Sequence, residues 1–225
     1  MKRVFLLFTV LLVIISYPID CGAVSGNVFC KKAGEGKRIA LTFDDGPHPI
    51  YTPKILDILE KYGINATFFV IGKNVENYPD AARAILESDS EVGNHTYTHK
   101  NVSRMSEKQL MYELEMTEKA VAALSDRRLC LFRPPEGSYG LPLEKASISK
   151  GYDIILWSID TLDWAHTPAN KIISDVKKKI SGGDIILMHD YTSGGHTCEA
   201  LEKLIPMLLS EGYEFVTVSE LICEE

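Results

Sequence analysis

The chain has 225 residues, of which 45% are hydrophobic, and its formal net charge at pH 7 is −7. This length and apolar content are typical of one folded domain with a buried core, and they argue against a disordered chain. A protein that binds nucleic acid needs a basic face for the phosphates, so the acidic balance argues against that class of partner. The only basic run, Lys177 to Lys179, is explained by a solvated helix face.

The N-terminus has the pattern of a secretory signal peptide. Lys2 and Arg3 precede an apolar stretch at residues 4–15, with Thr9 as its one polar residue, and this stretch is shorter than the roughly 20 residues that a membrane span needs. Polar residues and then small residues follow, as at a cleavage site. We therefore predict a signal peptide over residues 1–23, secretion or association with the cell wall, and no stable membrane span after cleavage; an uncleaved membrane anchor is the alternative.

A lead-in segment over residues 24–36 and a single domain over residues 37–225 complete the predicted organisation. Four cysteines would remain after cleavage: Cys30, Cys130, Cys198 and Cys223. An exported protein permits disulfides, but four cysteines allow three pairings, and none of them has the Cys-x-x-Cys spacing of a zinc or redox site. Free buried thiols and one disulfide therefore both stay open.

Apolar, strand-like runs alternate with amphipathic segments along this domain. Seven such runs are present, at residues 38–43, 66–71, 91–93, 129–132, 152–158, 184–188 and 214–218. Between the first two, Thr52 and Pro53 give a helix start and Gly63 a helix end. Ser106 with Gln109 has the pattern of a capping box before a further helix. Repeated β–α units predict a parallel sheet, and seven of them favour a barrel over an open sheet.

Two adjacent carboxylates, Asp44 and Asp45, end the first apolar run, and a Gly-Pro turn follows them. Like charges side by side cost stability unless a cation or a proton relieves them. His95 and His99 are four residues apart, so on a helical turn they would lie on one side and suit one metal ion. One carboxylate and two histidines would form a three-ligand divalent site with an open position, and the second aspartate would be left as a base. Alone, the aspartate pair also fits an ordinary turn, and the histidine pair also fits a surface or packed pair without a metal.

Three further polar clusters follow later apolar runs, at residues 133–137, 160–164 and 187–190. In a (β/α) barrel the carboxyl ends of all strands share one rim, whereas an open sheet would gather only two or three of these clusters. In their order along the chain, the five clusters resemble the motifs of the carbohydrate esterase family 4 polysaccharide deacetylases, the NodB homology domain. The resemblance covers roughly residues 38–221, and it implies a distorted (β/α) barrel of about seven parallel strands.

By this resemblance, Asp45, His95 and His99 would hold one divalent metal ion, with Zn²⁺ expected first and Co²⁺ or another divalent ion as alternatives. Such a metal lowers the pKa of a bound water from 15.7 to about 7. The family pattern gives Asp44 the part of general base. Arg133 matches the arginine that pairs with this base and orients it.

The leaving amine needs a proton, and His189 matches the family's general acid. An acid must be protonated when the amine leaves, yet a free histidine is mostly neutral at pH 7. Asp163 matches the aspartate that raises the pKa of this histidine. His48, His166 and His196 lack motif support, and we expect them to be surface or loop residues.

Four residues are expected to contact substrate: Glu136, Gly137, Trp164 and Leu187. In the family pattern a backbone N–H at Glu136 completes the oxyanion site, and Trp164 and Leu187 wall a pocket for the acetyl methyl group; plain core residues are the alternative for these two. The family usually has an aromatic residue, most often tyrosine, where this chain has Glu136. That departure puts the substrate in doubt more than the reaction. Asp160 is expected to stabilise a turn and not to take part in the reaction.

These residues predict a secreted, metal-dependent hydrolase that removes N-acetyl groups from a polysaccharide containing N-acetylglucosamine, acting as a monomer. Peptidoglycan is the first expectation for the substrate, with chitin oligomers or acetylxylan as alternatives. A non-catalytic carbohydrate-binding module on the same fold is a different class, and the intact base and acid argue against it. A two-metal phosphoesterase is a third class. It would need more carboxylates that bridge two metal ions, whereas the motifs of this chain supply ligands for one ion.

Overall fold

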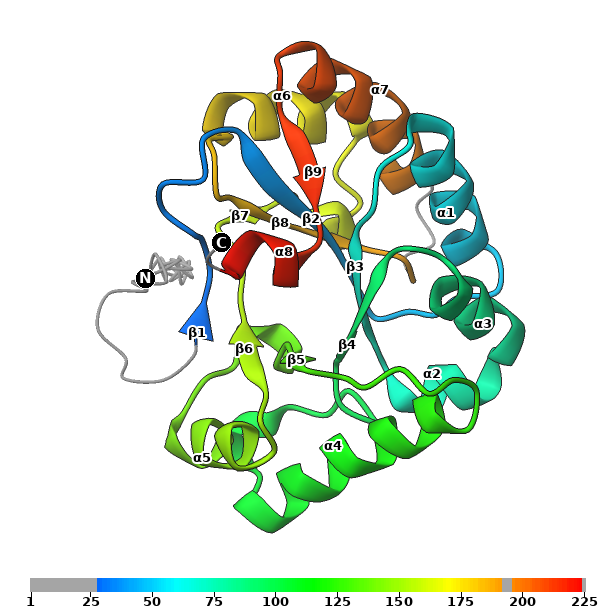
Figure 1. Ribbon diagram of the computed structural model, residues 1–225, viewed down its shortest axis with the longest axis vertical. Coiled ribbons are helices and arrows are strands. Elements are labelled where there is room, and N and C mark those ends of the chain that lie inside the picture. The colour runs from blue at the N-terminus through cyan, green and yellow to red at the C-terminus, as the bar shows by residue number, and fades with distance from the viewer. Residues whose placement is uncertain (1–27, 192–195, 224–225) are drawn as a thin grey trace, which may run out of the picture.

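A computed structural model describes residues 28–191 and 196–223 (Figure 1). The signal peptide predicted over residues 1–23 lies outside these described residues. Among the helices that the structure does describe, none combines the length and the apolar character that a membrane crossing requires.

Within the described residues, nine parallel strands form one curled sheet. The strands are β1 (Val28–Phe29), β2 (Arg38–Asp44), β3 (Thr67–Val70), β4 (Glu91–Asn94), β5 (Leu131–Phe132), β6 (Asp153–Ile155), β7 (Ile159–Asp160), β8 (Ile185–His189) and β9 (Glu214–Val216). Their order in the sheet is β1-β6-β5-β4-β3-β2-β8-β7, and β9 pairs with the first residues of β2.

β6 and β7 are consecutive along the chain but lie near opposite ends of the strand order. The short connection between them brings the two ends of the sheet together, so the sheet curls into a barrel. β6 pairs with β5 on one side, and β7, which begins four residues after β6 ends, pairs with β8. This confirms the distorted (β/α) barrel of parallel strands. Each of the seven expected runs contains a strand, and the two further strands, β1 and β7, have two residues each. β1 lies in the predicted lead-in segment, so the sheet begins before residue 37.

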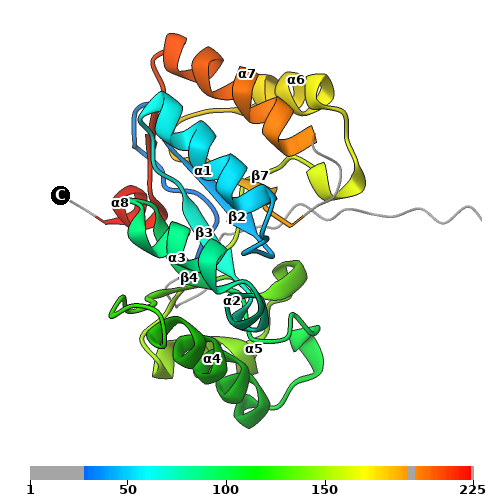
Figure 2. The same cartoon turned by 90° about the vertical axis from the view of Figure 1, so that its right-hand side faces the viewer.

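Eight helices of the described chain surround the strands. They are α1 (Tyr51–Tyr62), α2 (Gly72–Asn77), α3 (Pro79–Glu87), α4 (Glu107–Ala122), α5 (Leu141–Ser149), α6 (Ala169–Lys179), α7 (His196–Ser210) and α8 (Val218–Ile222). In Figure 2, α1, α6 and α7 lie together at one end of the molecule, with α4 and α5 at the other. The local helix signals are confirmed: Gly63 ends α1 at a φ of 61°, and Ser106 and Gln109 form a capping box at the start of α4.

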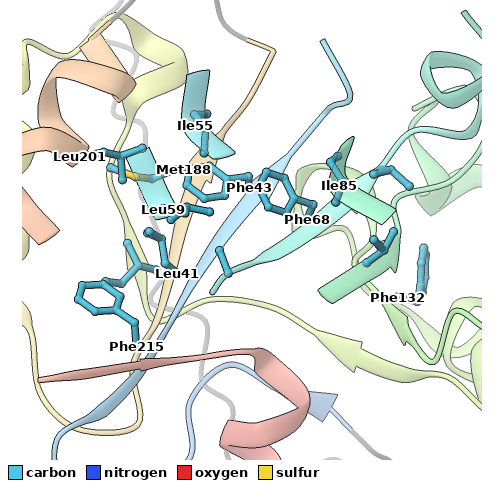
Figure 3. Close-up of a cluster of buried hydrophobic side chains, with 14 of the residues drawn as sticks. Leu41, Phe43, Ile55, Leu59, Phe68, Ile85, Phe132, Met188, Leu201 and Phe215 are labelled. Atoms are coloured by element: carbon cyan, nitrogen blue, oxygen red, sulfur yellow. The ribbon is translucent and has the colours of Figure 1, made fainter. Parts of the chain in front are cut away.

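The sheet separates two clusters of buried hydrophobic side chains. Successive side chains along a strand point to opposite faces of the sheet, which decides which of them face the barrel interior. Leu41 and Phe43 of β2 point outward, where Figure 3 shows them among side chains of the helical layer. Ala40, on the opposite face, packs in a second cluster that α8 closes with Val218 and Leu221. Because side chains alternate along a strand, Thr42 and Asp44 share the inward face of Ala40. The carboxylate at the strand end therefore enters the barrel.

Three cysteines of the described chain, Cys130, Cys198 and Cys223, are free thiols. Cys130 and Cys223 are exposed, so for these two the alternative of free thiols holds, but they are not buried. No disulfide forms among the three.

Candidate active site

The ends of neighbouring strands bring the sequence motifs to one rim. Asp44, the last residue of β2, is in register with His189, the last residue of β8. On the other side of β2 and β3, Asn94 ends β4 and is in register with Phe132, the last residue of β5. Since all these strands are parallel, their carboxyl ends meet at the same edge. The predicted clustering of the motifs is observed.

Asp45, His95 and His99 lie together and could hold one metal ion. One potential ligand atom from each lies within 4.8 Å of the other two. Oδ1 of Asp45 is 3.5 Å from Nε2 of His95 and 3.1 Å from Nε2 of His99. Burial would raise the pKa of the Asp45 carboxyl, but the two imidazoles hold it well below its usual range. The carboxyl is therefore held in the charged form that a cation needs.

Two further observations fit a cation at this place. Oδ1 of Asp45 is buried, and it accepts no hydrogen bond from the described part of the chain. A buried carboxylate oxygen without a donor is costly unless something positive satisfies it. Nδ1 of His95 lies 2.7 Å from the carbonyl oxygen of Arg133, which can only accept. In the neutral ring this places the proton on Nδ1 and leaves Nε2 with a lone pair toward Asp45.

The expectation that His95 and His99 lie on a helical turn is wrong. The segment between them is a loop with left-handed backbone at Thr96 (φ 66°) and at His99 itself (φ 53°). The side chain of Asn94 fixes this path, because its Oδ1 accepts the N–H of Thr96 at 2.8 Å. The two rings still meet, with centroids 5.0 Å apart.

A buried carboxylate that the sequence analysis missed holds the histidine loop from below. Glu113 of α4 accepts hydrogen bonds from the N–H groups of Tyr97 and Thr98 at 3.0 and 2.7 Å. Its other oxygen accepts the hydroxyl of Thr98 at 2.8 Å. Such contacts behind a ligand set fix its geometry. Glu113 is thus a positioning residue for His95 and His99.

Asp44 is oriented by a completely buried arginine. Nη1 of Arg133 donates to Oδ1 of Asp44 at 2.8 Å and to the hydroxyl of Thr42 at 2.7 Å. The remaining guanidinium nitrogens donate to the carbonyl oxygens of Ile155 and Leu156. With its donors spent on fixed partners, Arg133 holds one oxygen of Asp44 and leaves the other free to face the cavity.

His189 and Asp163 form the second polar pair. Asp163 accepts hydrogen bonds from Nδ1 of His189 at 2.8 Å, from its backbone N–H, from the hydroxyl of Thr197 and from the N–H of Trp164. Burial alone would lower the pKa of His189, but the adjacent Asp163 carboxylate raises it to about 9. The imidazole therefore keeps a proton at neutral pH.

These groups line one cavity of about 500 Å³. Its lining residues are Asp44, Asp45, His95, His99, Glu136, Trp157, Asp160, Trp164, Leu187 and His189. Of the expected substrate contacts, Leu187 is buried in the wall and Trp164 is 53% exposed. Glu136 is exposed at a φ of 59°, and its carboxylate accepts a hydrogen bond from Asn101 at 2.8 Å.

Gly137 packs against Trp157, which lines the cavity. A Cβ at this position would come within 2.8 Å of the Trp157 ring, so the glycine lets that indole pack against the turn. The N–H of Gly137 is used within the turn, where it donates to Pro134. Gly137 is not among the residues that line the cavity, and its contact with substrate stays a prediction.

Two lining residues were not predicted as part of the site. Trp157 falls within the apolar run at 152–158, where nothing in the sequence separates a core indole from one at the rim. Asp160 keeps the turn that was expected of it, since its Oδ1 accepts the N–H of Leu162 at 2.8 Å. It also lines the cavity, which its turn pattern does not reveal.

The fold and the site together define a β/α barrel with acid–base residues and a candidate metal site on its carboxyl-end rim. Residues 31–155 match the family model described as polysaccharide deacetylase. The chain belongs to this family, and the resemblance to carbohydrate esterase family 4 is confirmed.

Similar proteins have known descriptions. The chain is 40% identical over 204 residues to a peptidoglycan-N-acetylglucosamine deacetylase of Bacillus cereus, covering 88% of this chain and 94% of that protein. It is 34% identical over 198 residues to a chitooligosaccharide deacetylase of Bradyrhizobium, covering 82% and 90%. A crystal structure of a wild-type CE4 family pseudoenzyme from Bacillus anthracis matches with a TM-score of 0.84 at 32% identity, covering 89% of this chain and 70% of that one. Some other relatives are longer, and the chain spans 38% and 41% of two of them.

Proposed function

We propose that this protein is a secreted, metal-dependent hydrolase that removes N-acetyl groups from a polysaccharide containing N-acetylglucosamine. The observation that carries the proposal is that one cavity is lined both by a candidate metal site and by a candidate acid. A buried oxygen of Asp45 that accepts no hydrogen bond from the described residues faces two imidazole nitrogens, while His189, with its pKa raised to about 9, lies in the same cavity. Amide hydrolysis needs both an activated water and a proton for the leaving amine, and these two arrangements provide for one need each.

Asp45, His95 and His99 would hold the cation, which when bound would activate water and polarise the acetyl carbonyl. The identity of that cation is part of the proposal, with Zn²⁺ first, because one carboxylate and two imidazoles suit zinc and also accept other divalent ions.

Asp44 would take the proton from the attacking water, using the oxygen that Arg133 leaves free. The oxyanion would meet the backbone N–H of Glu136. The two hydrogen bonds of that turn come from the N–H groups of Gly137 and Ser138, so the turn itself does not use the Glu136 donor.

His189 would then give its proton to the nitrogen as the carbon–nitrogen bond breaks. Acetate and a free amine on the sugar are the products. Nδ1 of His189 is held by Asp163, so the proton that is transferred comes from Nε2. Asp163 stabilises the charged imidazole before the transfer and keeps the ring in one orientation.

Peptidoglycan is the proposed substrate. The relative from Bacillus cereus acts on N-acetylglucosamine in peptidoglycan by its name, and the predicted signal peptide would bring this chain to the cell wall. Chitin oligomers are the second candidate, which the similarity to a chitooligosaccharide deacetylase favours. The chemistry at the cavity is the same for both.

A catalytically silent carbohydrate-binding protein is the competing function, because one structural neighbour is a pseudoenzyme. A binding protein has no use for both a base held by Arg133 and an acid held by Asp163. Both pairs are intact in this chain, at 2.8 Å each. The complete acid–base set favours an enzyme.

The test is acetate release from three substrates: peptidoglycan, N-acetylglucosamine oligomers and acetylxylan. We expect release from peptidoglycan, loss of that release after chelation, and its return on addition of Zn²⁺. Folded protein that holds a divalent metal but releases no acetate from any of the three would favour the binding module. Full release by metal-free protein would overturn the proposed mechanism.

A further inference from the structure

Four aromatic side chains gather beside the catalytic cavity, and the reaction does not use them. His48 is at their centre, with its ring centroid 4.8 Å from Tyr51, 5.2 Å from Tyr191 and 6.2 Å from Tyr78. We call these four residues the aromatic patch. None of them belongs to the lining of the catalytic cavity.

The aromatic patch lies on the part of the rim where three neighbouring strands end. Tyr191 comes two residues after His189, which ends β8, and His48 comes three residues after Asp45, which follows β2. Tyr78 lies between α2 and α3, which follow β3. Since β8, β2 and β3 are adjacent in the sheet, the patch lies beside the strand ends that carry Asp44 and His189.

Hydrogen bonds fix the centre of the patch to the catalytic strands. The hydroxyl of Thr52 accepts the N–H of His48 and donates to the buried carboxyl of Asp190. The N–H of Asp190 donates in turn to the carbonyl oxygen of Asp44. Nδ1 of His48 accepts the N–H of Tyr51, and burial lowers the pKa of this histidine. The ring is therefore neutral and held in one place.

The patch is exposed at one ring and half-buried at the other three, His48, Tyr51 and Tyr78. Tyr191 is 43% exposed, and the neighbouring Ile50 is 55% exposed. Single exposed apolar side chains need no explanation, but several gathered at the edge of a catalytic cavity mark a binding surface. The four side chains include no carboxylate, lysine or arginine, so the patch offers ring faces and no ion pair to a ligand.

We propose that the aromatic patch binds a neutral pyranose unit of the glycan next to the sugar that is deacetylated. This inference rests on the proposed function. A cavity of about 500 Å³ has the size of a site for one small ligand, so a polymeric substrate must continue along the rim. Pyranose rings present flat faces of C–H groups, which stack on aromatic rings, while their hydroxyls stay in water. A rigid platform binds such a unit without a large ordering cost.

The test compares substrates of different length in the full chain. In Tyr191→Ala, kcat/KM should fall about tenfold for a hexasaccharide of N-acetylglucosamine, mainly through KM, and stay unchanged for the disaccharide. Tyr191→Phe keeps the stacking face and should behave as the unaltered protein. Tyr112→Ala, which removes a 58% exposed ring on α4, is the matched control and should leave kcat/KM unchanged for both substrates.

A second measurement separates this inference from the proposed function. Calorimetric titration of the hexasaccharide is carried out on Asp44→Asn with and without Tyr191→Ala, and the second change should weaken binding about tenfold. Weakened binding without acetate release by the unaltered protein would keep the subsite and overturn the enzyme. Equal loss for short and long substrates, or no loss for either, would overturn the subsite.

Discussion

Two clusters of histidine and carboxylate lie at the cavity, which His189 lines for one and Asp45 for the other, and they are built in opposite ways. Asp163 is buried, and its oxygens accept four hydrogen bonds, two of them from His189. Asp45 has a left-handed backbone (φ 75°), and its buried Oδ1 accepts none from the described residues, although the nitrogens of two histidines face it. One carboxylate is fully satisfied by the protein and the other is not.

This difference assigns a different task to each cluster. A carboxylate surrounded by donors stays charged and keeps a proton on the imidazole that it contacts. A buried carboxylate oxygen that faces the nitrogens of two imidazoles, at 3.1 and 3.5 Å, has a place for a cation. Similar residue types therefore give an imidazole with a raised pKa at His189 and a candidate metal site at Asp45, according to what surrounds them.

The largest expected effect separates the adjacent aspartates. Asp44→Asn should keep the bound metal while kcat falls by ~10²–10⁴, because the chain loses its general base. Asp45→Asn should instead lose metal affinity, since it removes a ligand oxygen. Elemental analysis of the two purified variants, with acetate release on the same samples, makes the comparison. If both lose metal equally, the two roles are wrongly assigned.

The acid cluster is tested through the pH dependence of the rate. Removing the carboxylate in Asp163→Asn should lower the pKa of His189, which the intact pair raises to about 9. Because the acid must be protonated, the alkaline limb of the kcat/KM profile should move to lower pH. An unmoved limb, with activity still measurable, would refute the pairing.

The same pair should appear in the stability of the metal-free protein. The folded-state pKa of His189 is raised from 6.5 to about 9, so the folded protein binds more protons between these values. The stabilisation is complete below pH 6.5 and is lost as the pH rises to about 9. In Asp163→Asn this contribution to the free energy of unfolding, measured by denaturant titration, should largely disappear.

A smaller effect is expected from the support of the metal cluster. Glu113→Ala removes three hydrogen bonds that hold the histidine loop, and it should weaken metal affinity about 10- to 100-fold. Glu115→Ala on the same helix is the matched control, because Glu115 makes only a 3.6 Å ion pair with Lys150 there. Zinc titration against a chelating dye measures both. Equal affinities would show that the loop holds its shape without Glu113.

The smallest effect concerns selection between glycans. Glu136 is exposed at the cavity and contacts Asn101, so Glu136→Tyr should keep the metal content and raise kcat/KM for neutral chitin oligomers relative to peptidoglycan by a few-fold. An aromatic ring stacks on a sugar face, whereas the carboxylate repels acidic substrates. A large, equal fall for both substrates would mean that Glu136 serves catalysis.

The fold was predictable because its signals are local. The apolar runs, the glycine that ends α1 and the capping box of α4 each depend on residues a few positions apart. Strand ends in a barrel share one rim, so the motif order also predicted which side chains would meet. The two-residue strands β1 and β7 were missed because neither lies in one of the apolar runs, whereas β5, also of two residues, lies within the run at 129–132.

The site was predictable where a motif carried it and not where distant residues completed it. The helical turn proposed for His95 and His99 failed because Asn94 and Glu113 stabilise a left-handed path, and Glu113 comes from a separate helix. Trp157 reads as a core residue within its run. Which oxygen of Asp45 would lack a donor depends on packing that no spacing reveals.

The most direct test of the two-cluster account is NMR of the histidine side chains in metal-free protein, with and without added Zn²⁺. We predict that His189 titrates near pH 9 in the metal-free protein, and that Nε2 of His95 and of His99 shifts as one equivalent of Zn²⁺ binds. A His189 that titrates near pH 6.5, or Zn²⁺ bound through His189 in place of His95 and His99, would contradict the account.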